Sequence, residues 1–484
     1  GFVWGFSASA MEFLFREYGA TGPRMQVYKA VVMLPWAMKP IFGLVSDSVP
    51  ILGLRKAPYI CLATVFAVVS YSVVGFSSPQ SLPIQVLLVA LLLGCAQVSI
   101  VDLLAEAAYS ERIRENPEHG PELISFVWGG ITVGGLVATA TVGFVIEHLG
   151  AQAVYAVLVV PAAVVLLPTT LNWLEEKHMV AADVARHRAS LWEQREVMFL
   201  VVLMGASTAL LVAVGLLQES AWVNLYVALA VAVVIVGCFS LLLSPVIGKV
   251  NCFFFIQTCC VIDISGAAFY FFTDGPSEYP EGPHFSKLFY ASGLGVFLSL
   301  LNLLGLWVYN HTMKDWRYHQ LLIFANVLQC GAGLLGVLVY TRWNIAVGLP
   351  DTFFVLGTMG AWAIVHMWMW IPGIVLLSQL CPKGVEATMY ALLAGCHNLG
   401  LTVASYIGAC ALTVLDVRPR GAVGESASFD KLWVAALVQA VAPAVTLVLL
   451  PWMIPNARQT EKLLDENTSS VDGSPWQGLV GSRG

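Results

Sequence analysis

The chain consists of long apolar runs separated by short segments where glycine, proline and charged residues gather. The first group of runs predicts helices at residues 1–18, 26–46, 58–77, 83–108, 123–148 and 152–171. The second group predicts helices at residues 197–217, 222–243, 250–273, 287–310, 317–341, 352–380, 386–414 and 431–454. A helix of about 20 apolar residues crosses a bilayer, so we predict an all-α polytopic membrane protein with about fourteen spans.

The composition supports a membrane setting. Of the 484 residues, 58% are hydrophobic and 11% are charged, whereas soluble domains carry about 25% charged residues. The ten cysteines show neither metal-ligand nor disulfide spacing, and we find no nucleophile triad or phosphate-binding loop. We therefore predict no enzyme activity, no cofactor, no metal and no nucleic-acid partner. The expected partners are the lipid bilayer and a small solute.

The distribution of Lys and Arg predicts the orientation, because cytosolic loops collect basic residues. If the first helix runs outward, the inner segments hold fifteen basic residues and the outer segments hold eight. Both ends of the chain are then cytosolic. A further cytosolic segment is expected ahead of Gly1, since the chain begins inside an apolar run. The plasma membrane is the expected location, with an organelle membrane as the alternative.

A faint internal repeat predicts how the helices are grouped. Residues 9–19 (SAMEFLFREYG) are echoed at residues 265–275 (SGAAFYFFTDG), and an apolar helix follows each segment. The repeat makes the first six helices equivalent to the last six. The predicted organisation is a six-helix half at 1–171, a cytosolic linker at 172–196, an inserted helix pair at 197–243, a second six-helix half at 244–455 and a cytosolic tail at 456–484.

Three sequence blocks carry a family resemblance. They are KPIFGLVSDSVPILGLRK at residues 39–56, VDLLAEA at 101–107 with Glu111 and Arg112, and CPKGVEATMYALL at 381–393 with Asn398 and Gly400. The acid-turn-base loop between two spans resembles the major facilitator superfamily. Together the three blocks resemble its folate-biopterin transporter family. The chain departs from the family pattern at Glu106, where the family often has Asp, and before Ser265, where the family has a proline.

The resemblance implies a secondary active transporter. It would move folate, biopterin or a related pterin by alternating access, with proton symport as a further hypothesis. The alternatives are transport of S-adenosylmethionine or another small solute, and a receptor on the same fold that does not transport. A pterin ring offers hydrogen-bond donors to a carboxylate, and the glutamate tail of folate offers carboxylates to a cation.

Lys39 is the first candidate for binding or coupling, because an ammonium inside an apolar run needs a partner or a water-filled cavity. It would hold the cargo's tail, Asp102 or Asp263; the alternative is a side chain that reaches the inner surface. Asp102 and Glu106 lie four residues apart and share a helix face. They would bridge to Arg55 or Lys56 at an inner gate, or handle a proton or the pterin.

The remaining candidates fall into three groups. Glu12 is a binding candidate that also faces Arg16 one turn away, and Asp263, in mid-helix, is a candidate for the pterin edge. The predicted gating residues are Asp47, Arg55, Lys56, Glu111 and Arg112. The predicted packing or motif residues are Pro40, Gly43, Gly130, Gly134, Pro382, Glu386, Asn398 and Gly400. Trp362, Trp368 and Trp370 are possible stacking partners for a pterin, with core filling as the alternative.

Overall fold

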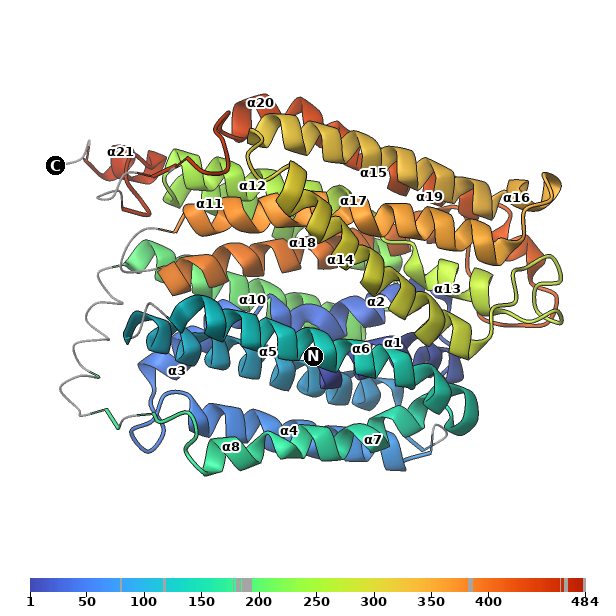
Figure 1. The fold of residues 1–484 in the computed structure, drawn as a ribbon, viewed down its shortest axis with the longest axis horizontal. Helices are drawn as coiled ribbons and strands as arrows, with labels where there is room; N and C mark the ends of the chain where they lie inside the picture. Colours follow the sequence, from blue (N-terminus) through green and yellow to red (C-terminus); the bar gives the residue numbers. More distant parts are fainter. Residues whose placement is uncertain are drawn as a thin grey trace. The chain divides into compact units, whose positions relative to one another are not determined.

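The computed structural model describes residues 1–78, 81–115, 119–176, 178–179, 184, 194–381, 386–461, 463–464 and 469–481. Helices dominate this part of the chain, and the extended pairing within it is limited to two isolated bridges. The helices of the first part are α1 (Phe2–Glu17), α2 (Gly22–Met33), α3 (Lys39–Ser48), α4 (Ala57–Phe76), α5 (Ile84–Glu115), α6 (Gly120–Leu149), α7 (Ala151–Val164) and α8 (Leu166–Thr170) (Figure 1).

Most of the later helices overlap the apolar runs that predicted them. They are α10 (Arg195–Leu217), α11 (Ala221–Leu242), α12 (Pro245–Cys260), α13 (Ser265–Thr273), α14 (Leu294–Thr312), α15 (Tyr318–Tyr340), α16 (Trp343–Ala346), α17 (Asp351–Gln379), α18 (Glu386–Val414), α19 (Leu432–Val441), α20 (Leu450–Met453) and α21 (Pro475–Gly481). Short 3₁₀ or π segments adjoin several of these helices, η1 (Leu34–Trp36), η3 (Phe289–Gly293), η4 (Ser426–Phe429) and η5 (Ala442–Val448).

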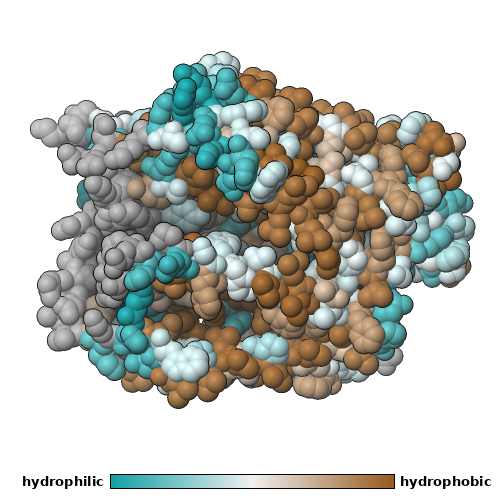
Figure 2. Space-filling view, viewed as in Figure 1, coloured by the Kyte–Doolittle hydropathy of each residue, from teal (hydrophilic) through white to brown (hydrophobic). Residues whose placement is uncertain are grey.

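Twelve helical segments within the described residues are long and apolar enough to cross a membrane. The helix α1, with 16 residues, and the helix α18 lie outside this set. The all-helical membrane fold is therefore confirmed, whereas the count of fourteen spans is not. On the faces drawn in Figure 2, hydrophobic side chains cover the long helices and hydrophilic ones gather toward helix ends.

The chain forms two compact units. The first comprises Gly1–Tyr18, Val31–Ala206 and Ser286–Gly293, and the second comprises Gly19–Ala30, Ser207–Phe285 and Leu294–Gly484. In the first unit α4 lies between α5 and α7, and in the second α15 packs against α17 and α19. The predicted grouping into two six-helix halves and an inserted pair stays a prediction, because the units are defined by packing rather than by the repeat.

Several membrane segments are broken within their length, and two of the breaks lie at candidate residues. The segment Gly22–Ser48 changes from α2 through η1 into α3, and Ser99 donates a hydrogen bond to the Pro35 carbonyl at 2.9 Å. The segment Pro245–Thr273 breaks between α12 and α13, although no proline precedes Ser265. Backbone groups freed inside a membrane must find protein partners. Broken helices of this kind form solute and ion sites in many transporters.

Candidate functional site

Lys39 and Asp102 form an ion pair inside the first unit. Lys39 begins α3 directly after the break, and Asp102 lies on α5. The Lys39 Nζ atom is 2.5 Å from Asp102 Oδ2, and it lies 4.6 Å from the centroid of the Trp36 ring. The Lys39 side chain is 14% exposed and the Asp102 side chain 38%. Asp102 therefore supplies the countercharge that an intramembrane ammonium requires, and the indole face adds a cation–π contact.

A second carboxylate accompanies this pair. Glu106 lies one turn beyond Asp102 on α5, on the same face of the helix, and it is partly buried. The cluster thus holds two carboxylates for one ammonium. The excess carboxylate is suited to accept a proton or a hydrogen bond from a ligand.

The loop between α3 and α4 carries a network of charges. Arg55 lies 3.4 Å from Asp47 and 3.4 Å from Glu111, and the Lys56 Nζ atom is 2.5 Å from Glu111 Oε2. The predicted gating residues are therefore brought together. The bridge was predicted to join Asp102 or Glu106 to Arg55 or Lys56. In the structure the carboxylate that pairs with Arg55 and Lys56 is that of Glu111 instead. The helix α5 continues to Glu115, and this extension brings Glu111 to the basic residues.

The linker supplies a contact that the sequence did not reveal. Glu176 accepts hydrogen bonds from the backbone N–H groups of Arg55, Lys56 and Ala57 at 2.6, 2.9 and 3.0 Å. These N–H groups lie at the start of α4, where a helix has unpaired donors and a positive dipole end. The neighbouring Glu175 pairs with the fifth gating residue, Arg112, at 2.5 Å. A carboxylate from a distant segment thus caps α4.

We expect Glu176→Gln to lower the stability of the purified protein by about 1–2 kcal/mol, because a charged cap on three N–H groups is lost. The measurement is thermal unfolding in detergent. The matched control is Glu175→Gln, since the exposed pair with Arg112 should contribute about 0–1 kcal/mol. Equal effects of the two changes would contradict the capping role.

Asp263 occupies the break between α12 and α13. One carboxylate oxygen accepts the Ser265 N–H at 2.9 Å, and the other accepts the Ser405 hydroxyl at 3.1 Å. The Asp263 carbonyl accepts a hydrogen bond from Gln26 Nε2 at 2.6 Å. These contacts tie α2, α13 and α18 together in the second unit and explain how the break is satisfied. Asp263 therefore has a structural role, and its predicted contact with the pterin stays a prediction.

The other predicted residues divide by their surroundings. Glu12 and Arg16 are partly buried on α1, and Pro40 lies in the first turn of α3. The helix α18 begins at Glu386 and contains Asn398.

The predicted packing glycines differ in the room around them. A Cβ atom added at Gly43 would lie 3.6 Å from Leu103, one added at Gly134 would lie 3.1 Å from the Phe2 nitrogen, and one added at Gly400 would lie 3.1 Å from Thr258. At Gly130 a Cβ would meet no described atom within 4 Å, so the predicted packing role is not seen there. Pro382 lies outside the described residues.

Sequence reasoning missed two histidines in the second unit. On α17 the ring of His366 stacks on Trp362, with centroids 4.7 Å apart, and lies 6.4 Å from Trp370. His397 of α18 lies 5.1 Å from Trp370. Trp368 instead donates its Nε1–H to the Gly305 carbonyl at 3.0 Å, which is a packing role. A lone histidine in an apolar run gives no signal of such a cluster.

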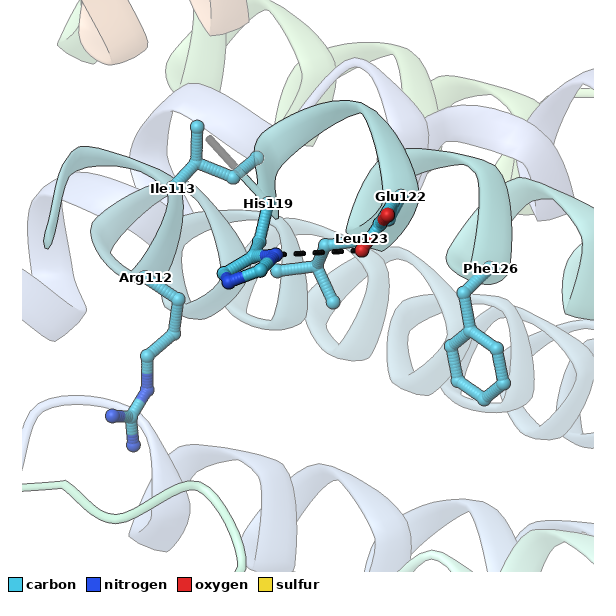
Figure 3. A pocket seen from close by; sticks show the side chains of 6 residues that line it. All are labelled: Arg112, Ile113, His119, Glu122, Leu123 and Phe126. Carbon is cyan, nitrogen blue, oxygen red and sulfur yellow. Dashed lines mark ion pairs between the residues drawn. The ribbon is translucent and has the colours of Figure 1, made fainter. Parts of the chain in front are cut away.

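One surface pocket, of about 390 Å³, lies where α5 and α6 meet. Its lining is Arg112, Ile113, His119, Glu122, Leu123 and Phe126 (Figure 3). Figure 3 shows His119 directed at Glu122, and the two are 3.4 Å apart. Both of these side chains are exposed, so the pocket is a solvated groove between α5 and α6 rather than a buried binding site.

The fold matches that of known transporters. The structure of the xylose transporter XylE from E. coli, described as an inward open conformation, aligns with a TM-score of 0.57 at 12% identity, over 99% of this chain and 97% of that one. The protein therefore has the fold of the major facilitator transporters.

The family model of the BT1 family matches residues 1–473, and the chain belongs to that family. "Folate-biopterin transporter" of Synechocystis sp. is 24% identical over 459 residues, covering 93% of this chain and 78% of that protein. "Probable folate-biopterin transporter 6" of Arabidopsis thaliana is 24% identical over 441 residues, covering 91% and 77%. The protein is thus a multi-pass membrane transporter, and the prediction that it is not an enzyme is confirmed by its family.

Proposed function

We propose that the protein carries folate, biopterin or a related pterin across a membrane by alternating access. The observation that carries this proposal is the cluster of Lys39, Asp102 and Glu106 within the spans of a BT1 family member. Intramembrane ionisable residues commonly mark the path of a solute or ion. The names of the relatives supply the class of cargo.

The charges of the cluster suit the chemistry of a pterin. A carboxylate such as Glu106 accepts two hydrogen bonds from the amino and N–H groups on the pyrimidine edge of the ring. The ammonium of Lys39 can attract a carboxylate of folate's tail, but only in competition with Asp102, its present partner at 2.5 Å. Biopterin has no such tail. The proposal therefore assigns Lys39 a larger share in binding folate than in binding biopterin.

Proton coupling is part of the proposal. Asp102 and Glu106 lie near one cation, Lys39, so one of the two carboxylates can take up a proton at little electrostatic cost. This proton would be carried together with an anionic cargo. Uptake is then expected to rise as the outside pH falls and to stop when the proton gradient is collapsed. The cytosolic location of both ends and the plasma membrane also remain proposals.

The test is uptake by vesicles that contain the purified protein. Labelled folate should accumulate, and unlabelled biopterin should compete with it while S-adenosylmethionine does not. Competition by S-adenosylmethionine alone would assign the alternative cargo. Binding without accumulation would assign a receptor.

We expect Asp47→Ala and Arg55→Ala to reduce turnover about 3- to 10-fold while surface expression stays within about twofold of the original. Arg55, in the loop, lies 3.4 Å from Asp47 at the end of α3, and contacts between such partly exposed side chains contribute roughly 1 kcal/mol to the balance between conformations. The measurement is initial uptake rate divided by surface-labelled protein. Normal turnover in both variants would remove the gate assignment.

A further inference from the structure

Four aromatic rings from two helices meet in the second unit. Trp362, His366 and Trp370 lie four residues apart on α17, and the planes of adjacent rings are inclined by 11° and 21°. Residues at this spacing share one helix face. His397 approaches Trp370 from α18, with the ring planes inclined by 59°. All four residues lie well inside their long helices.

The side of α17 that carries the rings differs from the side that packs against α14. On one side of α17, a Cβ at Gly360 would lie 2.5 Å from Leu301, and Trp368 bonds to Gly305, so this side is packed against α14. The side with the four rings faces α12 and α18, because a Cβ at Gly373 would lie 3.3 Å from Phe254. Trp362 and Trp370 nevertheless remain 40% and 39% exposed. Both indole side chains thus keep accessible surface, although His366 stacks on Trp362 and His397 lies beside Trp370.

Contact between a histidine and an aromatic ring one turn away is not itself unusual in this chain. The rings of Trp307 and His311 on α14 lie 4.5 Å apart with planes inclined by 36°, and those of Phe144 and His148 on α6 lie 4.4 Å apart with planes inclined by 59°. Both of these histidines lie in the last turn of their helix. The α17 cluster differs because it lies in mid-helix and receives a ring from a second helix.

The hydrogen bonds of Thr258 fix the tautomer of His397. The Thr258 hydroxyl donates its one proton to the Phe254 carbonyl at 2.7 Å. The same oxygen lies 2.9 Å from His397 Nδ1, so this nitrogen must donate to it. In the neutral ring, His397 Nε2 is then an acceptor, and it has no hydrogen-bond partner among the described residues. The ring nitrogens of His366 are likewise without a hydrogen-bond partner in the described part of the chain.

We propose that Trp362, His366, Trp370 and His397 form the subsite that binds the flat heteroaromatic ring of the cargo. The ring stacks on the accessible surface of the indole side chains, and His397 Nε2 accepts a hydrogen bond from an N–H or amino group on the ring's edge. This inference rests on the proposed function, and it assigns recognition of the ring to the second unit in place of Glu106.

The test measures binding of labelled biopterin and labelled folic acid to the purified full-length chain. We expect Trp370→Leu to weaken both ligands about 5- to 30-fold, because both carry the ring. Trp370→Phe keeps an aromatic face and should retain most of the affinity. The matched control is Trp307→Leu, which removes a Trp–His contact on α14 and should leave affinity unchanged.

Other outcomes decide against the subsite. Unchanged affinity in a folded Trp370→Leu variant, while the original chain binds both ligands, overturns the inference and leaves the proposed function standing. Failure of the original chain to bind or carry either ligand overturns the proposed function and the subsite with it. If Trp370→Leu does not fold, His397→Leu is measured instead, and normal affinity in that variant also overturns the inference.

Discussion

Replacing Asp102 with alanine is expected to reduce uptake about 30- to 1,000-fold. The change removes the carboxylate 2.5 Å from Lys39 and leaves an ammonium that is 14% exposed without its direct ion-pair partner. Removing one partner of a buried ion pair costs about 3–5 kcal/mol, and the 38% exposure of Asp102 reduces this to about 2–4 kcal/mol. The matched control is Glu219→Ala, because Glu219 pairs with Arg24 at 3.1 Å but is exposed.

The double variant Lys39→Ala with Asp102→Ala identifies the origin of this loss. If the unpaired charge is the cause, the double variant should transport better than Asp102→Ala alone. Lys39→Ala alone should weaken folate about 10- to 150-fold if Lys39 holds the tail, and should affect biopterin far less. If Lys39 serves only to pair with Asp102, both cargoes should suffer equally. Normal transport of both cargoes by Lys39→Ala would assign the lysine no role in either.

Gly408→Ala is expected to destabilise the second unit by more than about 3 kcal/mol, because an added Cβ has no room. This Cβ would lie 1.7 Å from the Asp263 carbonyl oxygen and 2.9 Å from Gln26 Nε2. The Asp263 carbonyl belongs to the backbone and cannot move aside as the end of a flexible side chain can. To relieve the overlap, α18 would have to move away from the break before α13. The contact between Gln26 and Asp263 would be lost with it.

The matched control is Gly331→Ala on α15, where an added Cβ would meet no described atom within 4 Å. Alanine is favoured over glycine in a helix by about 1 kcal/mol, so this variant should be as stable as the original or more so. Thermal unfolding in detergent measures both. A Gly408→Ala variant as stable as Gly331→Ala would show that the close approach at Asp263 does not exist.

The helices were largely predictable, because apolar runs bounded by polar segments report directly on membrane spans. The predicted end of one helix at residue 108 fell short of Glu115, since charged side chains in the last turns interrupted the apolar pattern. Glu111 was predicted to belong with Arg55 and Lys56 among the gating residues, but its direct ion pairs with them were not predicted. The break before Ser265 also carried no proline to announce it.

The candidate site could be predicted only in part, because it depends on contacts between segments that are distant in the sequence. The sequence placed Lys39 and Asp102 inside spans and offered their pairing as one alternative, but it could not choose between Asp102 and Asp263. Glu176 caps α4 across more than a hundred residues of chain, and no local pattern signals such a contact. The histidines of the α17 and α18 cluster became visible only when the two helices were placed side by side.

Solute counterflow tests the central claim, that this chain carries pterins, most directly. Vesicles containing the purified protein are preloaded with unlabelled biopterin and diluted into a trace of labelled biopterin. We expect a transient accumulation of label inside, because a carrier that alternates its access exchanges solute across the membrane. Protein-free vesicles should show none. Binding of label without such an overshoot would contradict the account.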